Sequence, residues 1–158
     1  MTAITQPPDL LQMDTATATA QAFMDYRDAV TTYGECELAE QELISYAPCQ
    51  HTTYPPIKAG YFYPAGIMAP ADAQAVIVPD QGGNGGYDIC VWMPAPTGTI
   101  GQAIRLTHGD LTIGRVISPA QWMQAARGGT LQQIPCAVAG ITPPATGFII
   151  SVVGLGGV

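Results

Sequence analysis

Apolar side chains in the first third of the chain recur at helical intervals. They are separated by steps of three, four and three residues, which places them on one stripe of a helix. This spacing predicts a helical segment over residues 15–47, with Asp14 as its N-cap. The residues of this first stripe are Phe23, Tyr26, Val30 and Tyr33. We expect the stripe to pack either on the rest of the chain or against a neighbouring copy.

A second stripe follows with the same steps, one residue out of phase, and Gly34 lies at the slip. Its residues are Cys36, Ala39, Leu43 and Tyr46. Two alternatives follow. Either the helix breaks at Gly34 into a helical pair, or one helix continues and its apolar stripe shifts around the helix axis at that point. Pro48 ends the helix in both cases, because proline lacks the N–H that helix continuation needs.

Residues 1–14 precede this pattern and show paired prolines without a sustained period. We therefore expect an extended arm that is held by a partner surface. Its apolar residues are candidates for that contact: Ile4, Leu10, Leu11 and Met13.

From residue 48 to 158 the composition shifts to Gly, Pro, Thr and β-branched residues. Short apolar runs alternate with turn signals, which predicts a small β-sandwich or barrel. The expected strands cover residues 57–63, 75–78, 87–93, 100–106, 111–117, 131–139 and 148–153. One short helix should interrupt them at "SPAQWMQAARGG", where Ser118 can cap, Pro119 suits the first helical position and paired glycines end it. The predicted fold class is α+β, mainly β.

Charge is scarce and unevenly distributed. Charged residues form 11% of the chain, against about 25% in ordinary domains. Residues 1–42 hold eight acids and one base, and residues 43–158 hold four of each, so the whole net charge of −7 lies in the first part. A surface so poor in charge indicates burial by copies of the chain or by a scaffold. Five scattered Lys and Arg residues argue against a nucleic-acid partner.

The chain shows no membrane or export signal. No base precedes an apolar stretch near the N-terminus, and the terminal run "GFIISVVGLGGV" is shorter than the ~20 residues that cross a bilayer. We expect synthesis in a reducing cytoplasm and therefore reduced thiols, although a particle released from the cell could oxidise them later. The cysteines concerned are Cys36, Cys49, Cys90 and Cys136.

Three stretches resemble chemical motifs. "VPDQGGNGGYD", residues 78–88, lacks the lysine and following helix of a phosphate loop and is typical of a hairpin connection. His108 and Asp110 lie in turn-like sequence without a nucleophile motif. Cys49 and His51 supply only two of the four ligands of a structural zinc site. We therefore expect neither an enzyme nor a metal or other cofactor. The enzyme alternative would use these two His residues, Asp110 and Cys49.

Aromatic residues concentrate in "YPPIKAGYFYP", residues 54–64. Such a segment favours a strand whose rings cover a core or an interface, while stacking on a glycan is the alternative. The interface candidates here are Tyr61, Phe62 and Tyr63, and a glycan site would add Tyr54.

The overall plan resembles that of bacteriophage virion structural proteins, and is most similar to head decoration (cement) proteins. The likeness lies in the N-terminal arm, the predicted strand pair "GTIGQAIRL…GDLTIGRVI" and the apolar ending "GFIISVV". It implies a non-enzymatic protein of the virion, assembled in the host cytoplasm, that binds the major capsid protein or other virion subunits and forms a homo-oligomer. The long helical pattern departs from the irregular arm of simple decoration proteins. This departure leaves open a tail, neck or head-fibre role, a receptor- or glycan-binding module, and a bacterial surface-layer or compartment-shell subunit.

Overall fold

The computed structural model describes residues 8–40, 69–70, 72–79, 86–107, 112–118, 122–125, 129–136 and 142–155, with backbone alone at 8–14, 37, 39, 40 and 122. Two helices and six strands form in the order α1 (Pro8–Glu40), β1 (Gln74–Pro79), β2 (Tyr87–Met93), α2 (Thr99–Leu106), β3 (Ile113–Ser118), β4 (Trp122–Ala125), β5 (Leu131–Gln133) and β6 (Ile149–Leu155). The strands make one open antiparallel sheet in the spatial order β1-β2-β6-β3-β4-β5. The α+β class, mainly β, is confirmed, and the described strands form an open sheet in place of the predicted sandwich or barrel.

The helix α1 begins at Pro8, well before the predicted start near residue 15. The expectation of an extended arm over residues 1–14 is therefore wrong from residue 8 onward, and residues 1–7 lie outside the described part. Proline at the first helical position explains the early start, because its fixed φ suits a helix and its missing N–H would have no partner there. The predicted end at Pro48 also lies outside the described residues.

Gly34 lies inside α1, so the chain forms one helix through this position and the helical-pair alternative is wrong there. The glycine is needed for close packing. A Cβ at Gly34 would stand 2.9 Å from Cδ1 of Ile89 and 3.0 Å from Cδ1 of Ile77, both on the sheet. The slip in the apolar stripe thus marks the point at which α1 approaches the sheet most tightly.

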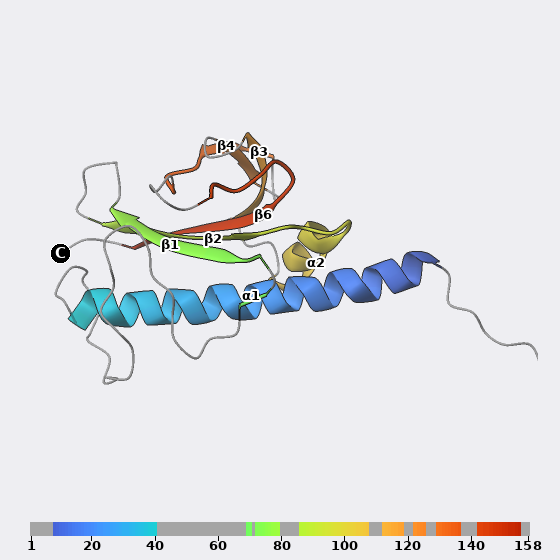
Figure 1. The fold of residues 1–158 in the computed structure, drawn as a ribbon, viewed down its shortest axis with the longest axis horizontal. Coiled ribbons are helices and arrows are strands. Elements are labelled where there is room, and N and C mark those ends of the chain that lie inside the picture. Colours follow the sequence, from blue (N-terminus) through green and yellow to red (C-terminus); the bar gives the residue numbers. More distant parts are fainter. Residues whose placement is uncertain are drawn as a thin grey trace, which may run out of the picture.

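The predicted first stripe of α1 packs on the sheet of the same chain. Figure 1 shows α1 running along β1 and β2. The four side chains are at most 4% exposed, and they share a core with Ile89 and Ile149 of the central strands. The stripe residues are Phe23, Tyr26, Val30 and Tyr33. Of the two alternatives for this stripe, packing on the chain itself is the one observed.

Both faces of the sheet are apolar because the strands alternate their side chains between two cores. In β2, for example, Ile89 and Val91 face α1, whereas Cys90 and Trp92 face the opposite side. The sheet curves away from α1 toward β3 and β4 (Figure 1). This second core contains Val76, Val78, Cys90, Trp92, Val116, Met123, Ile134, Cys136 and Ile150.

The predicted helix over residues 118–129 is wrong, since residues 122–125 form β4 between β3 and β5. Met123 and Ala125 are buried while Gln124 is exposed, which is the alternation of a strand. Capping signals act on a few residues only. Pairing with strands on both sides satisfies the backbone equally well and also buries Met123 in the second core.

The single short inserted helix is instead α2, where residues 100–106 were predicted to form a strand. Ile100, Ala103 and Ile104 have helical spacing and pack against the α1-facing core. Gly98 precedes the helix with a φ of 88°, which glycine adopts at no steric cost, and a Cβ there would lie 3.3 Å from the Cβ of Ala16. α2 therefore packs beside the early part of α1.

Most other strand predictions are confirmed. The stretch from residue 78 to 88 joins β1 to β2 as an antiparallel hairpin in which Pro79 pairs with Tyr87. The runs at 111–117 and 148–153 become β3 and β6. In the described part of the run at 131–139, residues 131–136, the strand covers Leu131–Gln133. The expected strand at 57–63 lies outside the described residues.

The expectation of reduced thiols is wrong for the described cysteines. Cys90 on β2 and Cys136 after β5 form a disulfide, with their Cα atoms 6.1 Å apart. Cys36 is also disulfide-bonded, to a partner outside the described residues. The sequence could not reveal the first bond, because 46 residues separate its cysteines and only the curvature of the sheet brings them together.

Candidate functional site

The helices cover the α1-facing side of the sheet only in part. A row of paired residues crosses this face from Ile149 on β6 through Arg115 on β3 and Gln124 on β4 to Leu131 on β5. Exposure rises along the row: Ile149 is fully buried, Arg115 and Gln124 are exposed, and Leu131 is 57% exposed. The strands β3, β4 and β5 therefore present an open sheet surface beside α2.

A groove of about 510 Å³ follows the border between α2 and this open sheet, and a second hollow of about 280 Å³ adjoins it. Arg115 and two α2 residues, Ile100 and Gly101, line both hollows. The larger one also includes Arg105 and Ile104 of α2 and Gln124 of β4. The groove is thus apolar along α2 and carries two guanidinium groups.

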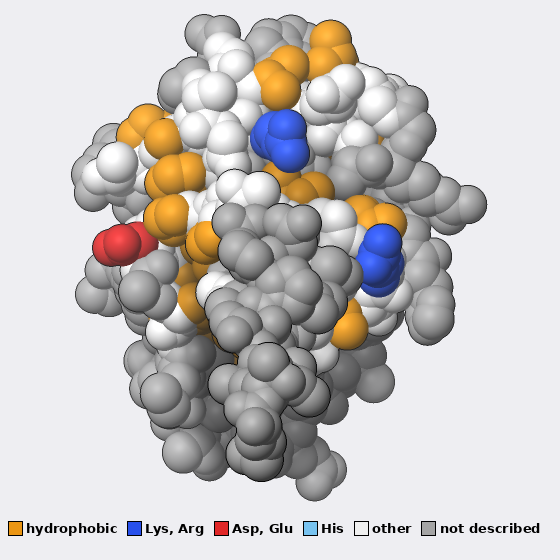
Figure 2. Space-filling model, turned by 90° about the vertical axis from the view of Figure 1, so that its right-hand side faces the viewer, with side chains coloured by type: hydrophobic (Ala, Val, Ile, Leu, Met, Phe, Trp, Pro, Cys, Tyr) orange, Lys and Arg blue, Asp and Glu red, His pale blue; other side chains and the backbone are white. Residues whose placement is uncertain are grey.

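Two large apolar side chains on α2 and β3, the elements that supply the arginines of the groove, are exposed to solvent. Leu106 of α2 and Ile117 of β3 are 39% and 40% exposed, and both follow the arginines closely in sequence. We call these residues the open surface: Arg105, Leu106, Arg115, Ile117, Gln124 and Leu131. Figure 2 views the α2 end of the molecule and shows two basic side chains among apolar ones on this face.

The two arginines of the open surface have no ion pair among the described residues, where the single salt bridge joins Arg27 to Asp28. No acidic side chain is found among the described residues that line the groove. The chain as a whole carries a net charge of −7. The open surface is therefore locally basic on an acidic protein, and it suits an apolar partner segment that carries carboxylates.

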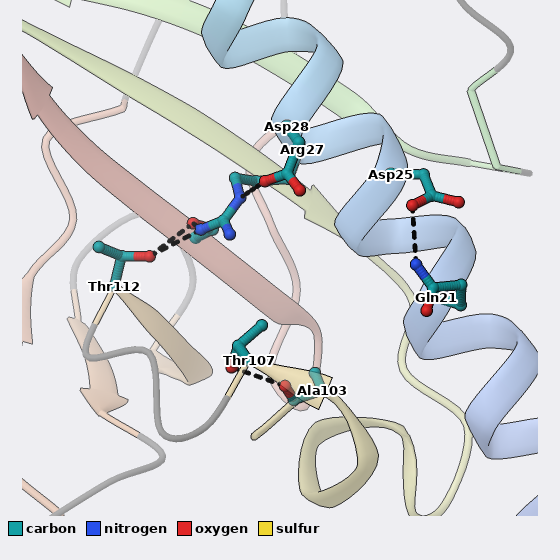
Figure 3. Close-up of polar contacts among 8 residues, drawn as sticks. Gln21, Asp25, Arg27, Asp28, Ala103, Thr107 and Thr112 are labelled. Atoms are coloured by element: carbon teal, nitrogen blue, oxygen red, sulfur yellow. Dashed lines mark hydrogen bonds and ion pairs between the residues drawn. The ribbon is translucent and has the colours of Figure 1, made fainter. Parts of the chain in front are cut away.

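Arg27 of α1 has a different role, since its side chain is only 11% exposed. Its Nη1 donates to Oγ1 of Thr112 at 3.0 Å and to Oγ of Ser151 at 3.2 Å, and the two hydroxyls are 3.0 Å apart. Its Nε donates to Oδ1 of Asp28 at 2.8 Å. Figure 3 shows this guanidinium reaching from α1 to the sheet. The cluster fastens α1 to the central strand β6 and to the start of β3 by charge-assisted hydrogen bonds.

Among the described residues, Glu35 on α1 carries a carboxyl that is partly buried. Partial burial raises the pKa of its carboxyl above the ordinary value of 4.5, because desolvation disfavours the charged form. Burial is the cause of this raised pKa, which indicates a packing effect.

The predicted interface residues fall into three groups in the structure. Phe23, Tyr26, Val30 and Tyr33 are buried in the chain's own core and present no surface to a neighbour. Ile4, Tyr61, Phe62 and Tyr63 lie outside the described residues, and Leu10, Leu11 and Met13 are described as helical backbone alone. Their interface role remains a prediction.

The candidate chemical residues Cys49, His51, His108 and Asp110 also lie outside the described residues. Within the described ranges, no three His, Cys, Asp or Glu side chains are grouped to hold a metal ion. No helix in these ranges is long and apolar enough to cross a bilayer.

The sequence pattern does not predict the open surface. Arg105 was expected on a strand and residues 122–125 on a helix, so nothing placed Arg105, Arg115 and Leu131 together. The available signal was the scarcity of bases after residue 42, where two of the four lie on this one surface. Comparison with family models, curated proteins and solved structures finds no match for this chain.

Proposed function

We propose that this chain is a non-enzymatic structural component of a bacteriophage virion, which binds the capsid shell or neighbouring subunits as a decoration protein. The observation that carries the proposal is the open surface. A monomer in water gains nothing from leaving Leu106, Ile117 and Leu131 exposed, whereas an assembly subunit buries them against a partner.

The energetics of repeated contacts support this function. Each apolar contact contributes about 25 cal/mol per Å² that it removes from water. In a symmetric particle the same contact recurs at every subunit, so a weak interface still stabilises the whole. The low charge content fits the same use, because few charged groups would have to lose their hydration when the surface is covered.

The disulfide between Cys90 and Cys136 is compatible with a virion that leaves the cell. Such a particle is assembled under reducing conditions and meets an oxidising medium after release. A position in the neck, tail or head fibre would use the same surface and the same oxidation step. The head decoration role is the form that we propose.

The experiment has two arms. In cells that produce the particle, the chain should sediment with assembled particles at a fixed ratio, and Leu131→Gln should lower that ratio. Leu131 is the most exposed large apolar side chain described, so this change removes contact area without opening a core. The matched control is Thr32→Gln on the exposed side of α1. A chain that is absent from purified particles would refute the proposal.

A further inference from the structure

The open surface and the beginning of α1 lie at the same end of the molecule. In Figure 1 the first turns of α1 run past α2, and in Figure 2 the basic side chains stand on that end. The packing of Gly98 beside Ala16 fixes where α2 contacts α1. Residues 8–14 precede this contact and extend α1 by about 10 Å at 1.5 Å per residue.

This projecting segment, "PDLLQMD", has the composition that the groove requires of a partner. It is helical in the structure, it contains Asp9 and Asp14, and its other residues include two leucines and a methionine. The groove offers apolar α2 side chains and the guanidinium groups of Arg105 and Arg115. Charge and hydrophobicity are therefore complementary between the two surfaces.

We propose that residues 8–14 of a second copy of this chain dock in the groove beside α2. Asp9 and Asp14 supply the carboxylates for Arg105 and Arg115, and the apolar residues cover the α2 side of the groove. The start of α1 and the groove lie at the same end of each chain. In a dimer around a two-fold axis, residues 8–14 of each copy can therefore bind in the groove of the other copy. This inference rests on the proposed function, as it names the partner of the open surface.

Light scattering coupled to size-exclusion chromatography tests the dimer with the full chain. The wild-type chain should show twice the monomer mass in 50 mM salt and dissociate more readily in 0.5 M salt, since salt screens exposed charges. Arg105→Glu with Arg115→Glu should weaken dimerisation about 100-fold or more, because carboxylates would then face carboxylates. Asp9→Lys with Asp14→Lys should do the same.

Mixing the two double variants is the decisive step. Each is repelled by its own copies, but the acidic helix end of one matches the basic groove of the other, and the reverse also holds. An equimolar mixture should therefore restore the dimer mass. The control is Asp25→Lys with Glu35→Lys, which makes the same change in net charge on the part of α1 beside the sheet and should leave dimerisation within about threefold. Circular dichroism verifies that every variant is folded.

The outcomes separate this inference from the proposed function. Dimers that persist in both charge variants, or a mixture that stays monomeric, would overturn the exchanged-helix contact. A wild-type chain that remains monomeric at millimolar concentration would overturn it as well, including the case in which a segment of the same chain fills the groove. The sedimentation of the chain with particles decides the proposed function independently of all three results.

Discussion

The helix-covered face of the sheet and the opposite face bury similar aliphatic side chains, but they are closed in different ways. α1 closes the first face with 33 continuous residues, a tight approach at Gly34 and the hydrogen bonds of Arg27. The second face has no described helix over it. Curvature of the sheet and the disulfide between Cys90 and Cys136 enclose its core. One core is therefore stabilised by local packing, and the other depends on a covalent link between distant residues.

Removing the covalent link should have the largest effect on the second face. Cys90→Ala combined with Cys136→Ala should lower the free energy of unfolding by about 4 kcal/mol, because the link closes a loop between residues 46 apart. Urea unfolding followed by the fluorescence of the buried Trp92 measures this change. The double variant leaves the bond of Cys36 intact, which a reducing agent would not. An unchanged urea midpoint would show that curvature alone holds the second core.

A bulky side chain at Gly34 should disturb the first face nearly as strongly. Gly34→Leu should lower the free energy of unfolding by about 3 kcal/mol, since even a Cβ at this position would stand 2.9 Å from Cδ1 of Ile89. The matched control is Gly101→Leu in α2, where nothing lies within 4 Å of an added Cβ. That substitution should stabilise the protein by up to about 1 kcal/mol through helix propensity. Equal effects at the two glycines, measured by urea unfolding, would contradict the close packing of α1.

The polar attachment of α1 should contribute less than its packing. Arg27→Met keeps an unbranched side chain as far as the position of Nε but removes the hydrogen bonds to Thr112 and Ser151, which should lower the free energy of unfolding by about 2 kcal/mol. The two hydroxyls can still bond each other, which limits the loss. Arg115→Met on the open surface is the control and should stay within about 0.5 kcal/mol in the same unfolding assay. A loss at Arg27 no larger than at Arg115 would show that packing alone holds α1.

Substitution of Glu35 should change the free energy of unfolding least, and the sign of that change is informative. Its pKa is raised in the folded state, so the folded chain holds this proton more tightly than the unfolded chain. The stabilisation is complete below the unfolded pKa near 4.5 and is lost as pH rises through the folded pKa. Glu35→Gln should therefore stabilise the protein at pH 7 by less than about 0.5 kcal/mol, and not at pH 4. Thermal unfolding at both pH values tests this, and a destabilised variant at pH 7 would contradict the burial of Glu35.

The difference between the two faces also explains what the sequence could predict. The stripe from Phe23 to Tyr33 has a helical period and is confirmed, because local spacing decides which side of a helix is buried. The strand at 87–93 is also confirmed, and residues 89–93 are buried on both of its faces. Residues 100–106 fit two patterns: Ile100 and Ile104 satisfy a helical step, and with Leu106 they also alternate as in a strand. Packing beside α1 selects the helix. Conversely, pairing with β3 and β5 overrides the capping signals around Ser118.

The candidate site could not be predicted for the same reason. Arg105 and Arg115 line one groove only because α2 is a helix and β4 is a strand, and both assignments depend on tertiary packing. The disulfide between Cys90 and Cys136 could not be predicted either, because its two cysteines come together only in the folded sheet. Periodicity specifies which side of an element is buried, and it carries no information about which separate elements meet.

The place of β6 in the sheet has a consequence for biosynthesis. It follows all the other described strands in sequence, yet it lies between β2 and β3 and joins the two halves of the ladder. Until the ribosome has made residues 149–155, the hairpin of β1 and β2 has no hydrogen-bonded connection to the remaining strands. Before residues 149–155 have been made, the described ladder is therefore in two parts, and the edge of β2 that pairs with β6 has no partner among the described strands.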